Sequence, residues 1–181
     1  MPDTSTVDIE QLNRHNFRAA LEALARPGDT YPVRPLFASP LLAMASVLLY
    51  GETSYHYQGS ADFDLVRAIC GANSQAADKA DYLFADQPDL HLLQAARPGT
   101  GECPELGATL ICLTDASTKT AVRLSGPGIN GEKQMSLPLP PAFIAAREQK
   151  NAYFPLGVDI LLLGEKVLMA LPRTTTIEVL A

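Results

Sequence analysis

The sequence FPLGVDILLLGEKVLMALPRTTTIEV, residues 154–179, contains two apolar runs that are joined by a Gly-Glu pair. The first run, Val158–Leu163, holds one acid, Asp159, and the second run covers Lys166–Leu171. A glycine at the first central position is typical of a type II′ turn, so we expect an antiparallel hairpin with Gly164 at its tip. Both runs are too apolar for a sheet with one wet face, which predicts a central hairpin covered by helices.

The chain changes character at the end of this hairpin. Pro172 cannot donate a hydrogen bond to a neighbouring strand, so the sheet pairing should stop there. Arg173, Thr174 and Thr175 follow, and one cation beside hydroxyl groups suits an anion or an acidic group of a partner. The alternatives are a solvated strand end, or a structural ion pair between Arg173 and Asp159 of the neighbouring strand. We favour the binding role for Arg173.

A second candidate site lies in the segment RLSGPG, which contains Arg123, Gly126 and Gly128. Glycines at the end of a strand allow backbone N–H groups to approach a phosphate or carboxylate. The alternative is an ordinary Gly-Pro-Gly turn, since Pro127 has no N–H to offer.

Composition indicates one globular domain over residues 1–181, because 47% of the residues are hydrophobic and 19% are charged. A net charge of −6 argues against a nucleic-acid partner. The N-terminus lacks the features of a signal peptide, and the longest nearly uncharged apolar run, Pro40–Tyr50, is too short to span a membrane. Three cysteines without a C-x-x-C pair suit the reduced thiols of a cytoplasmic protein.

The order of the elements predicts an α/β fold, a mixed β-sheet flanked by helices. In the first helix, Phe17, Ala20, Leu21 and Leu24 fall on one face at helical spacing. The expected helices cover residues 8–25, 39–50, 61–70, 86–96 and 138–150, and the expected strands before the hairpin cover 30–34, 54–58, 81–85, 107–113, 121–125 and 134–137.

The expected helix at Pro40–Tyr50 has almost no polar face. A helix that is apolar all round is buried either by its own fold or by a partner. We predict that it forms the interface of a homodimer, and the alternative is that it is the central buried helix of one chain.

The sequence shows no catalytic machinery. The three histidines have no H-x-x-x-H spacing, no serine lies in a G-x-S-x-G elbow, and the phosphate-binding glycine motifs are missing. No lysine stands out as the partner of a Schiff base. We therefore predict no catalytic residue, no metal and no cofactor, and an isolated chain that is inactive.

Several short segments resemble the PhnH family of the bacterial carbon–phosphorus (C-P) lyase system. They are NFRAALEALARPG, GATL, RLSGPG, FPLGVD and LPRTT, and they occur in the order of that family over nearly the whole chain. The resemblance implies a reduced form of the large domain of pyridoxal-phosphate-dependent transferases, without the cofactor. It also implies homodimers that assemble with the other core C-P lyase subunits.

The C-P lyase machinery transfers an alkylphosphonate onto the ribose of a nucleoside triphosphate with loss of the base, and the resemblance implies that this chain supports that step. The positions that it carries over as pocket or contact residues, with a nucleotide or phosphonate as the ligand, are Arg123, Gly126, Gly128, Arg173, Thr174 and Thr175. The alternative function is a free-standing small-molecule transferase with a phosphate pocket at Arg123 and Arg173.

Overall fold

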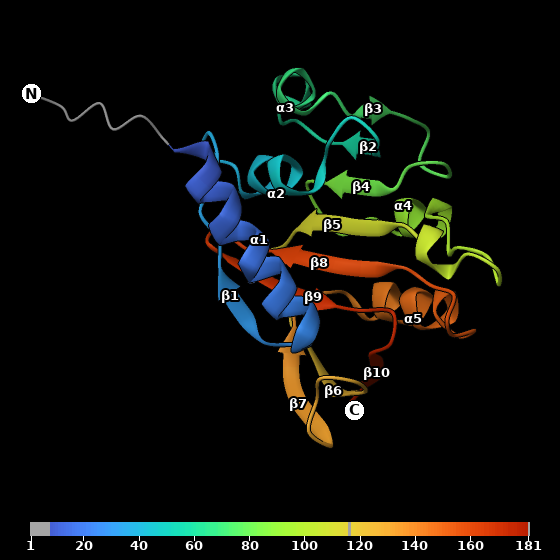
Figure 1. Cartoon of the computed structure of the whole chain (residues 1–181). Helices are drawn as coiled ribbons and strands as arrows, with labels where there is room; N and C mark the ends of the chain where they lie inside the picture. The colour runs from blue at the N-terminus through green and yellow to red at the C-terminus, as the bar shows by residue number, and fades with distance from the viewer. Residues whose placement is uncertain (1–7, 116, 181) are drawn as a thin grey trace, which may run out of the picture.

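The computed structural model describes residues 8–115 and 117–180, and it has two sheets (Figure 1). The large sheet has seven strands in the order β1-β9-β8-β5-β4-β2-β3, and the small sheet has the order β10-β6-β7. The expectation of no signal peptide rests mainly on residues 1–7, which lie outside the described ranges. The helical elements are α1 (Ile9–Ala25), α2 (Pro40–Leu48), α3 (Phe63–Cys70), α4 (Leu90–Ala95), the 3-10 turn η1 (Pro104–Leu106) and α5 (Pro141–Lys150).

The predicted mixed sheet flanked by helices is confirmed. The strands of the large sheet are β1 (Thr30–Pro32), β2 (Ser54–Gln58), β3 (Asn73–Ser74), β4 (Tyr82–Ala85), β5 (Thr109–Leu113), β8 (Asp159–Leu163) and β9 (Val167–Leu171). The strands of the small sheet are β6 (Thr120–Ser125), β7 (Glu132–Leu137) and β10 (Thr176–Val179). Strands β2, β4, β5 and β8 are parallel to one another, while β9 is antiparallel to β8.

The central hairpin is present, but its turn differs from the prediction. Strands β8 and β9 pair antiparallel between β5 and β1, and β9 ends directly before Pro172, as expected. The N–H of Gly164 donates to the carbonyl of Val167 at 2.8 Å, so the two central residues are Glu165 and Lys166. Gly164 has no positive φ, and the type II′ prediction is therefore wrong. The carbonyl of Lys166 accepts the N–H of Val33 at 2.9 Å, so the chain that leads out of β1 helps to hold the turn.

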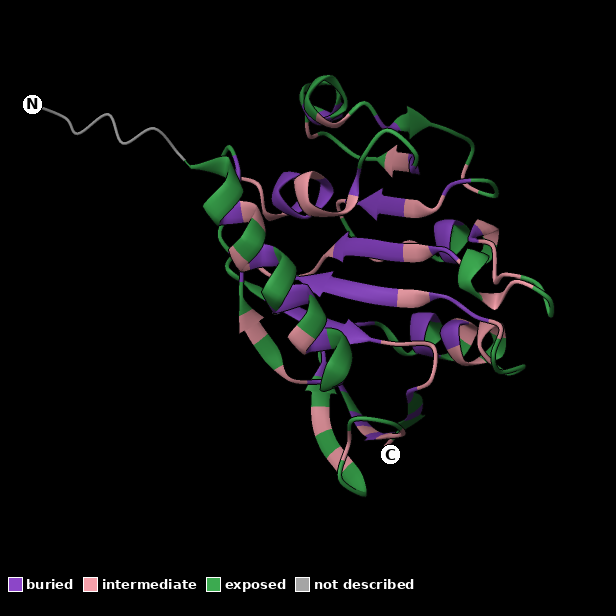
Figure 2. Ribbon diagram, viewed as in Figure 1, coloured by how far each residue is buried: buried purple, intermediate pink, exposed green. Residues whose placement is uncertain are grey.

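Helix α2 is buried within its own chain. Its residues 41–45 are all buried, and Figure 2 shows the start of the helix in the colour of buried residues. Leu41, Leu42, Met44 and Ala45 pack in one cluster with alanines of α1 and residues of the large sheet, while Ala43 packs with Leu12 and Leu36. The alternative, a central helix buried by its own chain, is therefore correct. Helix α2 cannot provide the homodimer interface that we predicted there.

Helix α1 buries Leu12 but leaves most of its large apolar side chains exposed. Of the face expected from sequence, Ala20 is buried, whereas Phe17, Leu21 and Leu24 are exposed. The buried face consists mainly of small side chains, which allow α1 to pack closely on α2 and β9. The side chain of Asn16 fixes the rotation of the helix, because its amide makes two 2.9 Å hydrogen bonds with the backbone of Arg34.

Helix α4 begins later than the sequence predicted. Its N-cap is Asp89, whose carboxylate accepts the N–H of Leu92 at 2.9 Å. Asp86, the first residue of the expected helix 86–96, instead accepts the hydroxyl of Tyr57 and both the N–H and the hydroxyl of Ser60, each at 2.8 Å. Asp86 therefore joins the ends of β2 and β4 and is not available to α4.

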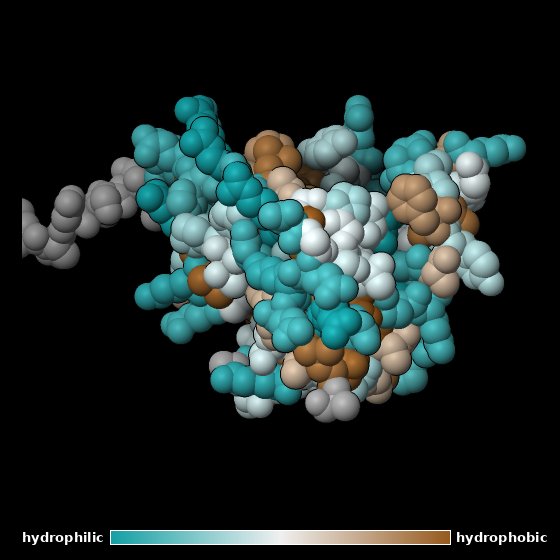
Figure 3. Space-filling model, turned by 90° about the horizontal axis from the view of Figure 1, so that it is seen from below, coloured by the Kyte–Doolittle hydropathy of each residue, from teal (hydrophilic) through white to brown (hydrophobic). Residues whose placement is uncertain are grey.

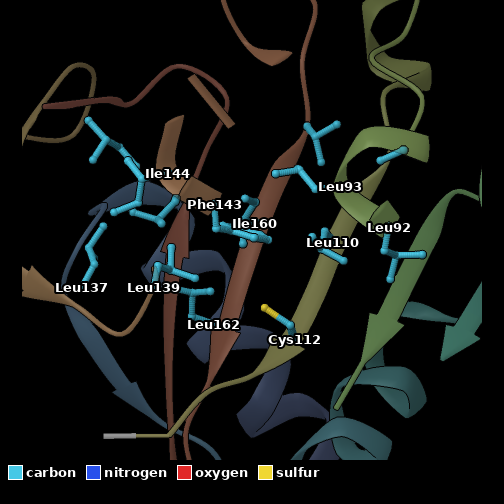
Figure 4. Close-up of a cluster of buried hydrophobic side chains, with 14 of the residues drawn as sticks. Leu92, Leu93, Leu110, Cys112, Leu137, Leu139, Phe143, Ile144, Ile160 and Leu162 are labelled. Carbon is cyan, nitrogen blue, oxygen red and sulfur yellow. The ribbon is translucent and has the colours of Figure 1, made fainter. Parts of the chain in front are cut away.

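The second core lies between the large sheet, α4 and α5. Figure 4 shows leucines of α4 and the apolar side chains of α5 pointing toward β5 and β8. Leu137 and Leu139 extend the same cluster to the small sheet. Burial raises the pKa of the Cys112 thiol in this core to about 12, so at neutral pH it is an unreactive apolar group. Over the described ranges, no helix has the length and hydropathy that crossing a membrane requires.

We expect Met44→Ala to lower the free energy of unfolding by about 2–5 kcal/mol, because Met44 is fully buried in α2. The loss should not depend on protein concentration, since the chain covers this helix itself. Denaturant unfolding at two protein concentrations measures it. Ile69→Ala, at an exposed position of α3, should change stability by less than about 0.5 kcal/mol. A dependence of the Met44→Ala effect on concentration would show that a partner covers α2.

Candidate functional site at the end of helix α5

A cleft of about 530 Å³ lies between the C-terminal half of α5, the link from β9 to β10 and the turn after β6. We call it the α5 cleft. It is lined by Pro127, Arg147, Glu148, Asn151, Ala152, Phe154, Arg173, Thr174, Thr175 and Thr176. Three of the residues predicted from sequence, Arg173, Thr174 and Thr175, therefore line one cavity.

Arg173 makes the internal ion pair that sequence reasoning named as the alternative. Its Nε and Nη2 donate to Oδ2 of Asp159 at 3.1 and 2.7 Å, and its backbone N–H donates to Oδ1 at 2.7 Å. The carbonyls of Pro104 and Gly107 accept from Nη1 and Nη2 at 2.8 and 3.4 Å. The fork of the guanidinium is thus occupied by protein acceptors, which argues against our prediction that Arg173 serves binding more than folding.

Two glycines make room for this arginine. A Cβ on Gly107 would stand 2.4 Å from Nη1 of Arg173 and 2.6 Å from the carbonyl oxygen of Gly157. Gly157 itself has a φ of +149°, and its N–H donates to the carbonyl of Pro98 at 2.9 Å. The segment before β5 and the segment before β8 therefore close tightly around Arg173.

A second arginine, Arg147 of α5, is the most important residue that sequence reasoning missed. Its side chain is 1% exposed, and it donates to Glu148, to the carbonyl of Pro172 and, at 2.6 Å, to the carbonyl of Thr175. Burial lowers the pKa of its guanidinium, while the charge of Glu148 acts in the opposite direction. Its spacing of four residues from Phe143 could have indicated a buried position, because the two fall on one face of the helix.

Arg147 and Glu148 together hold the link between β9 and β10. The second carboxylate oxygen of Glu148 accepts the N–H of Ile177 at 3.1 Å, and Thr175 closes a turn by donating its N–H to Pro172 at 2.9 Å. The hydroxyl of Thr175 and Nε of Arg147 are buried without a hydrogen-bond partner among the described residues. The polar groups of the cleft thus mainly fix the backbone of residues 172–177.

The RLSGPG segment is divided between two places. Gly126 lies against Thr174 and Thr175, since its Cβ would stand 2.6 Å from the carbonyl oxygen of Thr174. Gly128 instead faces the end of α1, where a Cβ would stand 2.3 Å from the carbonyl oxygen of Ala25. Both glycines have a positive φ, so both are needed for the path of the turn.

Arg123 lies on the small sheet, outside the described lining of the α5 cleft. It pairs with Glu132 at 3.4 Å and with Glu178 at 3.2 Å, on the strands at either side of β6. Figure 3 views the molecule from this end and shows a mainly hydrophilic face with separate apolar patches. Arg123 and Arg173 therefore do not form the single phosphate pocket that one alternative required.

The rim of the cleft carries two exposed aromatic side chains. Tyr153 is 78% exposed and Phe154 is 70% exposed, in the loop that follows α5. Exposed aromatic residues next to a cavity are typical of the centres of protein interfaces. Within residues 8–115 and 117–180, no three His, Cys, Asp or Glu side chains come together as they would around a metal ion.

Comparison with known proteins now supplies the family. Residues 6–178 match the PhnH family, described as bacterial phosphonate metabolism protein. The chain belongs to the PhnH family. A relative from Stutzerimonas stutzeri, named as C-P lyase subunit protein HtxG, is 32% identical over 169 residues, which cover 90% of this chain and 84% of the relative. The alpha-D-ribose 1-methylphosphonate 5-triphosphate synthase subunit PhnH of Rhizobium meliloti (strain 1021) is 34% identical over 82 residues, 44% of this chain and 41% of that protein.

Membership of the PhnH family agrees with the resemblance seen in the sequence, and it gives the chain a subunit role in phosphonate metabolism. It does not assign a function to any residue of the α5 cleft. The candidate residues Arg123, Gly126, Gly128, Arg173, Thr174 and Thr175 are therefore judged by their geometry alone.

Replacing Arg173 by alanine should lower the free energy of unfolding by about 3 kcal/mol, because Asp159 is left without its partner in a mostly buried position. Arg123→Ala is the matched control, since Arg123 also pairs with carboxylates but on the surface, and we expect a loss of about 0–1 kcal/mol. Denaturant unfolding measures both variants. Equal small losses would mean that Arg173 does not stabilise the fold.

The tight fit at Gly107 gives a second test. Gly107→Ala should cost about 1–3 kcal/mol through overpacking against Arg173. Gly101→Ala should be nearly neutral, because no atom lies within 4 Å of the added methyl group. Thermal melts of both variants measure the difference, and a Gly107→Ala protein as stable as the unchanged chain would contradict the packing described above.

Proposed function

We propose that this chain is a subunit of the C-P lyase core complex that supports transfer of an alkylphosphonate onto the ribose of a nucleoside triphosphate, with release of the base. We further propose that it acts through contacts with the other subunits and that the isolated chain is inactive. The observation that carries this proposal is the internal use of its cationic groups: Arg173, Arg147 and Arg123 all bind acceptors of the same chain.

These internal contacts favour a subunit over a free-standing transferase. A phosphate pocket needs cations whose donors face the ligand, because bidentate contact is what makes arginine selective for phosphate. Here the fork of Arg173 holds Asp159, while Arg123 is held by two glutamates on another sheet. A nucleotide or phosphonate would have to displace those carboxylates before it could bind at either arginine.

The surface next to the α5 cleft supports a contact role. Tyr153 and Phe154 offer large apolar area at low entropic cost, and the cleft beside them could receive a side chain of a partner. The loop that carries them begins at the end of α5, which Arg147 and Glu148 fasten to the β9–β10 link. The aromatic pair is therefore presented from a well-anchored element.

Other parts of the proposal rest on the sequence and on the PhnH resemblance rather than on the site. They are a cytoplasmic location, a homodimer of the isolated chain, and a fold derived from the large domain of pyridoxal-phosphate-dependent transferases without the cofactor. A seven-stranded sheet with antiparallel β9 beside five parallel strands is compatible with that origin.

The double change Tyr153→Ser and Phe154→Ser tests the contact role. We expect the melting temperature to stay within a few degrees, because both side chains are exposed. Recovery of the other C-P lyase subunits with the tagged chain should fall, and growth on methylphosphonate as the sole phosphorus source should fail. Tyr50→Ser, an exposed aromatic position after α2, is the matched control and should preserve both. Catalytic activity of the purified chain alone would instead support the transferase alternative.

A further inference from the structure

The small sheet ends in an open edge strand, β7. It covers six residues, Glu132–Leu137, and it pairs with β6 alone within residues 8–115 and 117–180. Figure 1 shows β7 and the turn that joins it to β6 extending away from the large sheet. An edge strand presents a row of unpaired backbone N–H and C=O groups, which is a template for another strand.

The register of the small sheet shows which groups of β7 point outward. The N–H of Leu180 donates to the carbonyl of Ala121 at 2.9 Å, so the odd-numbered residues of β6 face β10 and its even-numbered residues face β7. These even-numbered residues pair with the odd-numbered residues of β7. The backbone groups of Glu132, Gln134 and Ser136 therefore point outward, and they make no hydrogen bond to another element in the described part of the chain.

The other three sheet edges are short or covered. Strand β3 has two residues, and β1 has three, of which the last is Pro32. The outer side of β10 lies against α5, where Glu148 accepts the N–H of Ile177 at 3.1 Å. Native sheets limit edge pairing by short strands, by proline and by covering elements. Among the described strands, β7 is the sheet edge that has none of these three devices.

The charges of β7 do not keep another strand away. A lysine on an edge strand can prevent pairing, but the ammonium group of Lys133 is held by Asp29. Glu132 pairs with Arg123 of the neighbouring strand β6. Gln134 carries no charge and is exposed, as is Ser136. The outward edge of β7 is therefore unpaired, and its charges are already balanced within the chain.

A second copy of β7 matches this edge in antiparallel orientation. With a twofold axis at Gln134, the backbone of Gln134 pairs with its own copy, and Glu132 pairs with Ser136 of the second copy. All outward N–H and C=O groups of these residues then have partners. No like charges lie directly opposite each other, and the two Lys133 residues, which meet on a diagonal, are each held by Asp29 of their own chain.

We propose that this chain forms a homodimer in which β7 pairs with β7 of a second copy and joins the two small sheets into one continuous sheet. The pairing is closed, because each copy uses the same edge and leaves no free side of β7 for a further strand. The inference rests on the homodimer that is part of the proposed function, and it places the interface at the small sheet, away from α2.

Sedimentation equilibrium of the isolated chain over a range of concentrations tests the interface. Gln134→Lys puts two ammonium groups directly opposite each other across the axis, so it should weaken the dimer by about tenfold or more at low salt. Added salt should restore part of the loss, because it screens exposed charges. Ala121→Lys is the matched control, since Ala121 is also exposed but lies one strand in from the edge, and it should leave the dimer unchanged.

Gln134→Cys tests the register of the pairing. Under mild oxidation this variant should form a disulfide-linked dimer, because paired Cα atoms at this position lie about 5.5 Å apart, within the range of a disulfide. Ser136→Cys should be linked much less, since it faces Glu132 of the second copy. The unchanged chain is the background control, because its own Cys70 and Cys103 are not fully buried.

The outcomes separate this interface from the proposed function. A dimer that Gln134→Lys leaves unchanged, or a dimer in which Gln134→Cys is not linked, overturns the β7 interface and leaves the homodimer standing. A monomer at every concentration overturns both, while recovery of other C-P lyase subunits with the tagged chain would still support the subunit function. If Gln134→Lys lowers that recovery but leaves the dimer intact, the edge binds another subunit, which also overturns the inference.

Discussion

The ion pair between Arg173 and Asp159 is the contact on which the arrangement of the cleft depends. Arg173 leaves the central hairpin directly after Pro172, and its guanidinium reaches back to the start of β8 and across to the carbonyls of Pro104 and Gly107. Three separate parts of the chain therefore meet on one side chain. Arg147 also joins separate parts of the chain. It donates to the carbonyls of residues 172 and 175 and so fixes the path of the backbone into β10. Removing one partner of a buried ion pair leaves the other charge uncompensated, so the fold depends on the close approach to Arg173 that Gly107 and Gly157 allow.

The pairing of these arginines within the chain limits which ligands the cleft can bind. Cations that are held by carboxylates and carbonyls of their own chain give shape to a surface, but they offer few donors to a small anion. Large apolar side chains remain exposed at Tyr153 and Phe154, in the loop that follows α5, and at Phe17 and Leu21 of α1. These surfaces are consistent with the contacts to other subunits that we propose.

What the sequence could predict was mostly local. The hairpin and its end at Pro172 follow from neighbouring residues, and the structure has both. The side of α1 that is buried depends on how closely α2 and β9 approach, and alanines permit a closer approach than the phenylalanine and leucines that the periodicity favoured. The backbone carbonyls that Arg147 binds lie more than twenty residues away in sequence, and no local pattern in α5 predicts them. For Arg173 the correct partner, Asp159, could be named, but only the structure could show that the guanidinium is shared with Pro104 and Gly107.

The coupling free energy between Arg173 and Asp159 tests the central claim most directly. A double-mutant cycle with Arg173→Ala, Asp159→Ala and the double variant measures it by denaturant unfolding of the isolated chain. If the pair is a structural junction, the double variant should be less destabilised than the sum of the single changes, with a coupling of about 1–3 kcal/mol. Additive effects, together with a melting temperature of the unchanged chain that rises with added nucleoside triphosphate or methylphosphonate, would show that Arg173 serves a ligand instead.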